Sequence, residues 1–138
     1  MPQKRINMDK RDLKPSCVFE QFARVCEIPR PSKREEKMIE YLRNWGLSHN
    51  LETKVDSVGN VLIKKPATPG YEDRQTVILQ SHMDMVCDKL VDKEFDFDND
   101  SIQTHIEGEC IHSRRGNPAH RGKWHGGWFH ERGHADKP

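Results

Sequence analysis

The segment that most constrains the fold is an unbroken run of strand-forming residues, Thr-Val-Ile-Leu at positions 76–79. Strands that are apolar without alternation are typical of the interior of a sheet covered on both faces. We therefore predict an interior strand over residues 76–82, with more polar chain on either side. Because a buried strand needs helices packed around it, the run favours an α/β fold.

A histidine and an aspartate stand at the end of this run, as His82 and Asp84. Residues two apart in an extended chain point to the same side, so the two side chains can meet at the open end of the strand. A metal-bound imidazole usually has its second ring nitrogen held by a carboxylate. The pair is thus a candidate metal site. Because the pattern is short, a solvated pair at a strand–loop boundary is the alternative interpretation.

Two helices are predicted before this strand. The first follows Ser16, whose side chain can cap it, and ends before Pro29. Its apolar residues recur at helical spacing and are Val18, Phe19, Phe22, Val25 and Cys26. Ser32 and Glu35 form a capping-box pattern for the second helix, which we expect to end near Gly46. Its apolar face is typical of a core-facing helix and carries Met38, Ile39, Leu42 and Trp45.

Two strand pairs are also expected. Residues 51–55 and 61–64 are separated by a Gly-Asn turn signal, and residues 102–106 and 110–112 by Glu-Gly. Between them, residues 95–100 read Phe-Asp-Phe-Asp-Asn-Asp, an oxygen-rich spacing that suggests calcium. The glycine and distal glutamate of a calcium-binding helix-loop-helix motif are missing, so we interpret this segment as a surface loop.

Charge and cysteine content narrow the cellular context. The formal net charge of +1 gives no electrostatic case for nucleic acid or for an anionic membrane surface. No apolar stretch approaches the length of a membrane span, and residues 1–10 lack the apolar core of a signal peptide. The cysteines show no Cys-x-x-Cys spacing and are expected to be reduced thiols in the cytoplasm: Cys17, Cys26, Cys87 and Cys110.

Three phrases carry a resemblance to a known family. They are CEIPRPS at residues 26–32, GNVLIKKPAT at 59–68 and VILQSHMDMV at 77–86. Together they resemble the aminoacyl-histidine dipeptidases, also called cytosol non-specific dipeptidases, which belong to the zinc-dependent peptidases with a two-metal catalytic domain. The resemblance runs over about residues 15–113. It implies a fold of helices packed on a mixed sheet.

The resemblance also implies an activity and two site residues. His82 corresponds to a zinc ligand and Asp84 to the catalytic-site carboxylate that orients it. In the full-length family, two zinc ions act on dipeptide substrates such as Xaa-His, and a zinc-bound water attacks the scissile carbonyl. The family's bridging carboxylate, general base and later metal ligands have no counterparts in this chain. We therefore expect zinc binding here to be incomplete at most. The near-neutral charge leads us to expect no nucleic-acid or membrane partner.

The last segment differs sharply in composition. Residues 112–138 contain no Val, Ile, Leu or Met, yet hold five of the eight histidines: His112, His120, His125, His130 and His134. Such a segment cannot bury an aliphatic core, so we predict that residues 114–138 are a disordered tail outside the family. Back-translation of residues 115–126 with a one-nucleotide shift permits a glycine-rich phrase like the family's. We hypothesise that the chain runs out of frame after about Ser113.

These observations divide the chain into a flexible N-terminus at 1–13, a partial metallopeptidase catalytic domain at 14–113, and the tail at 114–138. The expected function is that of a zinc-dependent dipeptidase present as a truncated and inactive fragment. The alternative is a non-enzymatic fragment whose histidine-rich tail binds metal adventitiously. The oligomeric state and the preferred dipeptide are left open by the sequence.

Overall fold

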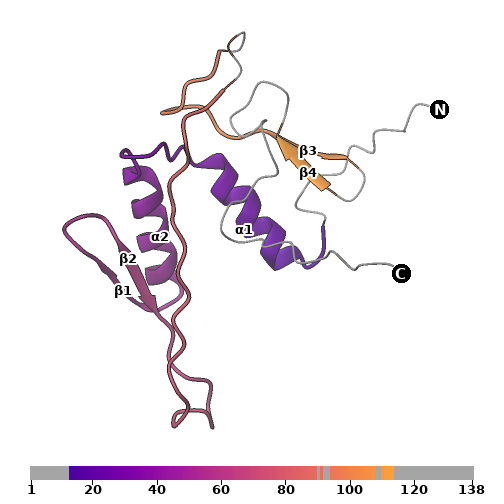
Figure 1. Cartoon of the computed structure of the whole chain (residues 1–138). Coiled ribbons are helices and arrows are strands. Elements are labelled where there is room, and N and C mark those ends of the chain that lie inside the picture. The colour runs from indigo at the N-terminus through magenta and orange to yellow at the C-terminus, as the bar shows by residue number, and fades with distance from the viewer. Residues whose placement is uncertain (1–12, 90, 92–93, 108–109, 114–138) are drawn as a thin grey trace, which may run out of the picture.

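The computed structural model describes residues 13–89, 91, 94–107 and 110–113. Two helices come first and four strands follow, in the order α1, α2, β1, β2, β3, β4 (Figure 1). The expected combination of helices and strands is confirmed. The described strands, however, form two separate antiparallel pairs instead of one mixed sheet. The predicted disorder of residues 114–138 and nearly all of the predicted flexible N-terminus fall outside the described residues.

Helix α1 spans Ser16–Glu27 and buries Ala23 and Cys26 completely. The predicted cap is wrong, because Ser16 is the first helical residue and Pro15 occupies the capping position without a side-chain bond. The carbonyl of Pro15 accepts the first helical hydrogen bonds, from Val18 N at 3.1 Å and Phe19 N at 3.3 Å. The helix stops before Pro29, as its sequence predicts.

Helix α2 spans Glu36–Ser48, and its predicted capping box is also wrong. Glu35 is the capping residue, yet its carboxylate accepts from Lys33 N at 2.6 Å, and the Ser32 hydroxyl turns toward Asp84. The Ser32 and Glu35 side chains therefore bond to partners outside α2 and do not cap it. Met38 is buried on the inner face, as expected.

The end of α2 lies two residues beyond the predicted Gly46. Asn50 has a φ of 55°, in the left-handed region that follows many helices. Leu51 N donates to Gly46 O and Asn50 N to Leu47 O, both at 3.0 Å. These two bonds are the pair that closes a Schellman motif, with asparagine in the place usually taken by glycine.

Strands β1 (Glu52–Val55) and β2 (Val61–Lys64) form the first predicted hairpin, which is confirmed. They pair in an antiparallel register that sets Glu52 opposite Lys64, and both strands contact α2. Gly59 lies in the turn with a φ of 94°. A Cβ at this position would meet Ile39 Cδ1 at 2.8 Å, so both the backbone conformation and the space favour glycine.

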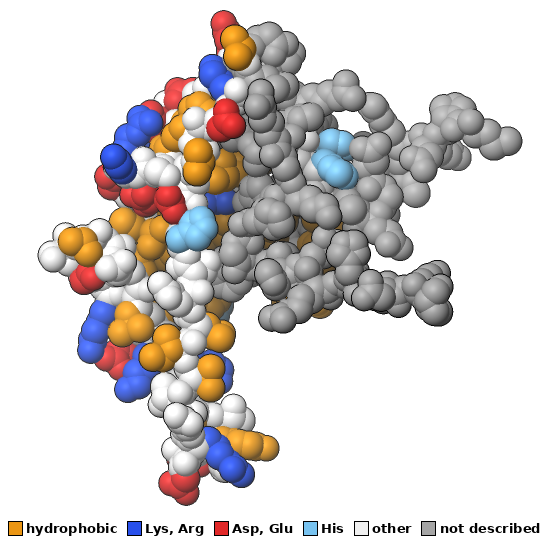
Figure 2. All heavy atoms as spheres, viewed as in Figure 1, with side chains coloured by type: hydrophobic (Ala, Val, Ile, Leu, Met, Phe, Trp, Pro, Cys, Tyr) orange, Lys and Arg blue, Asp and Glu red, His pale blue; other side chains and the backbone are white. Residues whose placement is uncertain are grey.

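The predicted interior strand over residues 76–82 is not formed. The chain leaves β2, turns near Gly70 and returns as an extended segment without strand pairing (Figure 1). Val77, Ile78 and Leu79 are 78%, 84% and 92% exposed. The arm at the bottom of Figure 2 accordingly shows hydrophobic side chains lying open on the surface. The physical reason is that no strand among the described residues lies beside 76–82 to form a ladder with it.

The second predicted hairpin is confirmed as β3 (Thr104–Glu107) paired with β4 (Cys110–Ser113). It is tied to α1 through the buried Ile102, whose backbone N donates to Cys26 O at 2.9 Å. Along the described part of the chain, no helix is long and apolar enough to cross a membrane.

Candidate metal-ligating site

His82 and Asp84 lie side by side, as their spacing predicts. His82 Nδ1 is 2.8 Å from Asp84 Oδ1. An ionised carboxylate only accepts hydrogen bonds, so Nδ1 is the nitrogen that carries the proton. Nε2 is then left with its lone pair, which is the form in which an imidazole binds a metal. The His82 side chain is 66% exposed and that of Asp84 34%, so the pair is accessible from solvent.

The second oxygen of Asp84 is held by Ser32, which stands in the turn between α1 and α2. The Ser32 hydroxyl donates to Asp84 Oδ2, and it also lies 3.2 Å from Met85 O. This hydroxyl first, and the imidazole of His82 second, hold the pKa of the Asp84 carboxyl below its ordinary value. Asp84 therefore has one partner on each oxygen and favours its ionised form.

Backbone pairing fixes the segment that carries the two side chains. Pro31 and Met85 form a parallel bridge. Met85 N donates to Arg30 O at 2.9 Å, and Ser32 N donates to Met85 O at 3.0 Å. Residues 30–32 thus pair like a short strand with the chain around Met85. This pairing keeps the chain next to Asp84 extended.

Arg30 anchors this short strand to α1. Its side chain is buried and donates from Nη1 to Val25 O at 2.6 Å, with a longer contact of 3.4 Å to Ile28 O. These carbonyls lie at the end of α1, where a helix leaves backbone acceptors without partners of its own. Burial lowers the pKa of the guanidinium, while the neighbouring Cys26 and Asp84 oppose that shift.

The described residues do not complete a metal site. Nowhere in the described parts of the chain do three His, Cys, Asp or Glu side chains gather so that they could hold a metal ion. A catalytic zinc normally has about three protein ligands and one open position. His82 is one such ligand at most, so the donor set falls short of a working zinc centre.

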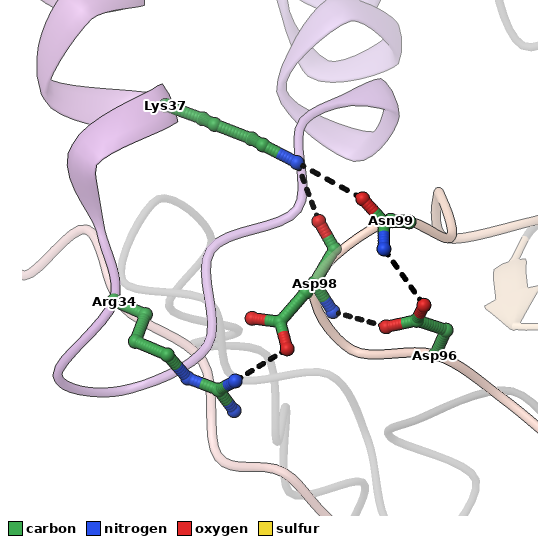
Figure 3. A network of polar contacts seen from close by, with 5 residues as sticks. All are labelled: Arg34, Lys37, Asp96, Asp98 and Asn99. Atoms are coloured by element: carbon green, nitrogen blue, oxygen red, sulfur yellow. Dashed lines mark hydrogen bonds and ion pairs between the residues drawn. The ribbon is translucent and has the colours of Figure 1, made fainter.

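The aspartates of residues 95–100 are engaged within the loop and with α2, in agreement with the predicted surface loop (Figure 3). Asp96 accepts from Asp98 N at 2.9 Å and from Asn99 Nδ2 at 2.7 Å. Asp98 pairs through its carboxylate with Arg34, and its carbonyl accepts from Lys37 Nζ at 2.6 Å. These oxygens thus hold the loop against the start of α2.

Two residues of the site were missed by sequence reasoning. The sequence predicts a helix-capping role for Ser32, because its pattern with Glu35 is local and its actual partner is 52 residues away. The sequence pattern gives Arg30 no site role. The signal that could have found both is the phrase CEIPRPS, in which an arginine and a serine flank a proline.

Comparisons with known proteins agree with this fold. No protein-family model matches the chain. It is 44% identical over 102 residues to the cytosol non-specific dipeptidase of Escherichia coli (strain K12), across 74% of this chain and 21% of that protein. The crystal structure of aminoacylhistidine dipeptidase from Vibrio alginolyticus matches with a TM-score of 0.75 at 40% identity, over 78% of this chain and 22% of that one. The chain thus spans about a fifth of the length of these relatives. In sequence and in fold, the chain resembles about a fifth of an aminoacylhistidine dipeptidase.

Proposed function

We propose that this chain carries one part of the metal centre of a zinc-dependent dipeptidase and that it does not hydrolyse peptides by itself. The observation that supports the proposal is the bond from His82 Nδ1 to Asp84 Oδ1, which leaves Nε2 as a metal-binding atom. In this role His82 is the zinc ligand, and Asp84 orients it. The substrates of the complete enzyme would be dipeptides such as Xaa-His, in keeping with the names of the two relatives.

The expected inactivity follows from the ligand count. One imidazole does not hold a catalytic zinc, and no group of three or more His, Cys, Asp or Glu among the described residues could hold a metal ion. Asp84, the carboxylate bonded to His82, orients the imidazole. Loss of a general base alone costs about 10²–10⁴-fold in rate. The purified chain should therefore show no dipeptidase activity above background.

The test is hydrolysis of an Xaa-His dipeptide with added zinc, measured for this chain and for its His82→Ala variant. We expect both proteins to match the buffer blank. Robust turnover by the chain that disappears in the variant would refute the proposed inactivity. It would mean that ligands outside the described residues complete the centre.

The composition of the tail supports a second candidate, in which the chain is a non-enzymatic fragment that binds metal adventitiously. Five of the eight histidines lie in residues 112–138. Equilibrium dialysis against zinc distinguishes the two candidate functions. It compares the His82→Ala variant with a variant in which the five histidines of residues 112–138 are changed to glutamine. Adventitious binding requires that only the second variant loses most of its zinc.

For the cellular context we propose the cytosol, which the name of the Escherichia coli relative supports. The formal net charge of +1 favours neither nucleic acid nor an anionic membrane as a partner. Among the described residues, Cys17, Cys26 and Cys87 are not joined in disulfides.

A further inference from the structure

Ser32 connects the turn between α1 and α2 to the His82–Asp84 pair. Its hydroxyl donates to Asp84 Oδ2, while Asp84 Oδ1 faces His82 Nδ1 at 2.8 Å. The backbone of the same residue is fixed as well, because Ser32 N donates to Met85 O at 3.0 Å. The hydroxyl is therefore held at one place relative to the chain that carries the carboxylate.

We propose that Ser32 is a positioning residue that sets the tautomer and the orientation of the His82 imidazole through Asp84. A carboxylate with one unpartnered oxygen can rotate about its Cβ–Cγ bond and offer the imidazole either oxygen or neither. The Ser32 hydroxyl removes this freedom, because it occupies Oδ2 and leaves Oδ1 directed at Nδ1. The proton is then kept on Nδ1 and the lone pair on Nε2.

A purely structural role for Ser32 makes a different prediction. Its hydroxyl also lies 3.2 Å from Met85 O, where it could support the parallel bridge between Pro31 and Met85. Two backbone bonds at Arg30 and Ser32 already form that bridge without any side chain. Loss of the hydroxyl should therefore leave the pairing in place and change the imidazole, whereas a structural role would change the pairing alone.

The value of this arrangement for metal binding rests on the proposed function, but the tautomer is a property of the chain itself. It can be measured with histidine labelled with ¹⁵N, in alkaline buffer where imidazole side chains are uncharged. Two-bond ¹H–¹⁵N correlations distinguish an Nδ1-protonated ring from an Nε2-protonated one. The signals that vanish in a His82→Gln variant identify His82 among the eight histidines.

The variants are Ser32→Ala, which removes the hydroxyl, and Ser32→Cys, which replaces it with a somewhat larger thiol that is only a weak donor. Ser32→Thr retains the hydroxyl and is the rescue variant. The matched control is Ser81→Ala, since Ser81 is next to His82 and its hydroxyl donates to the backbone carbonyl of His82, at 3.3 Å, and not to the imidazole or to Asp84 among the described contacts. Backbone amide shifts of residues 84–86 report whether the bridge persists in each protein.

We expect His82 to be predominantly Nδ1-protonated in the unaltered chain, in Ser32→Thr and in Ser81→Ala. In Ser32→Ala and Ser32→Cys, the population should shift toward the tautomer mixture of a free imidazole, with the amide shifts of residues 84–86 preserved. Unchanged tautomers in both variants would overturn the proposal, and so would an equal shift in Ser81→Ala. Either result would leave the dipeptidase proposal standing, because that proposal is tested by hydrolysis and by zinc content.

Discussion

At the residue scale, Asp56 organises the turn between β1 and β2. Its Oδ1 accepts from Val58 N at 3.0 Å and from Asn60 N at 2.8 Å, and its Oδ2 accepts from Asn60 Nδ2 at 2.7 Å. Bonds to the charged form favour that form, so the amide of Asn60 in particular holds the pKa of Asp56 below its ordinary value. The Asp56 carboxylate thus stabilises the turn by accepting hydrogen bonds from its backbone.

This arrangement predicts a pH dependence of stability. Because the pKa of Asp56 is lower in the folded state, the unfolded chain binds more protons in acid. The stabilisation is fully present above the ordinary pKa of 3.8 and is lost as the pH falls through the folded value. The urea midpoint should exceed that of Asp56→Asn near neutral pH, with the difference closing in acid. A difference that is the same on both sides of 3.8 would contradict this explanation.

At the scale of elements, α2 and β1 meet where Gly46 faces Thr53. A Cβ placed on Gly46 would lie 2.2 Å from Thr53 Oγ1 and 3.3 Å from Thr53 Cβ. The hydroxyl cannot easily turn aside, since it donates to Leu51 O at 3.1 Å. Glycine inside a helix costs about 0.5–1 kcal/mol relative to alanine, so the close approach of strand to helix accounts for its presence.

The contact predicts a coupling between these two positions. Gly46→Ala should lower the free energy of unfolding, because overpacking costs about 1–3 kcal/mol and exceeds the gain in helix propensity. In a Thr53→Ala background the hydroxyl is gone, and the same change should be nearly neutral or stabilising. Urea unfolding of the four proteins gives the coupling, expected at about 1–2 kcal/mol. Additive effects would show that Thr53 is not the obstacle.

The elements also show what could be predicted from the sequence. Both helices and both hairpins were predicted, because helical spacing and turn residues act over a few positions. The caps predicted at Ser16 and Ser32 are not formed, because a capping pattern does not exclude other partners, and Ser32 bonds to a carboxylate 52 residues away. The pairing of His82 with Asp84 was predictable because it depends on two neighbouring positions of one extended segment.

At the scale of the whole molecule, the segment 76–79 departs most from its sequence-based prediction. The apolar run was correctly recognised, but burial of a strand depends on neighbours supplied from elsewhere in the fold. Val77, Ile78 and Leu79 instead remain on the surface of the described structure. Exposed apolar residues in an extended, unpaired segment favour self-association.

A substitution in this segment tests that view. Leu79→Lys, alone or with Ile78→Lys, should reduce self-association in sedimentation velocity and leave the thermal unfolding midpoint unchanged, because neither side chain is buried. The control is Ala23→Lys, at a position that is 0% exposed in α1 and should not tolerate a charge. If the lysines at 78 and 79 lower the midpoint as much as the control does, the segment is packed in solution.

The parallel bridge between Pro31 and Met85 has a consequence for the order of folding. Each helix and hairpin closes over a few residues, whereas this bridge closes a loop of more than fifty, since Ser32 bonds to Met85 O at a separation of 53. Loop-closure entropy rises with length, so contacts of such high contact order form late. The segment that carries the His82–Asp84 pair should therefore dock after the helices and hairpins form and detach before they open, with exchange of the Met85 amide hydrogen faster than that of the helical amides as its signature.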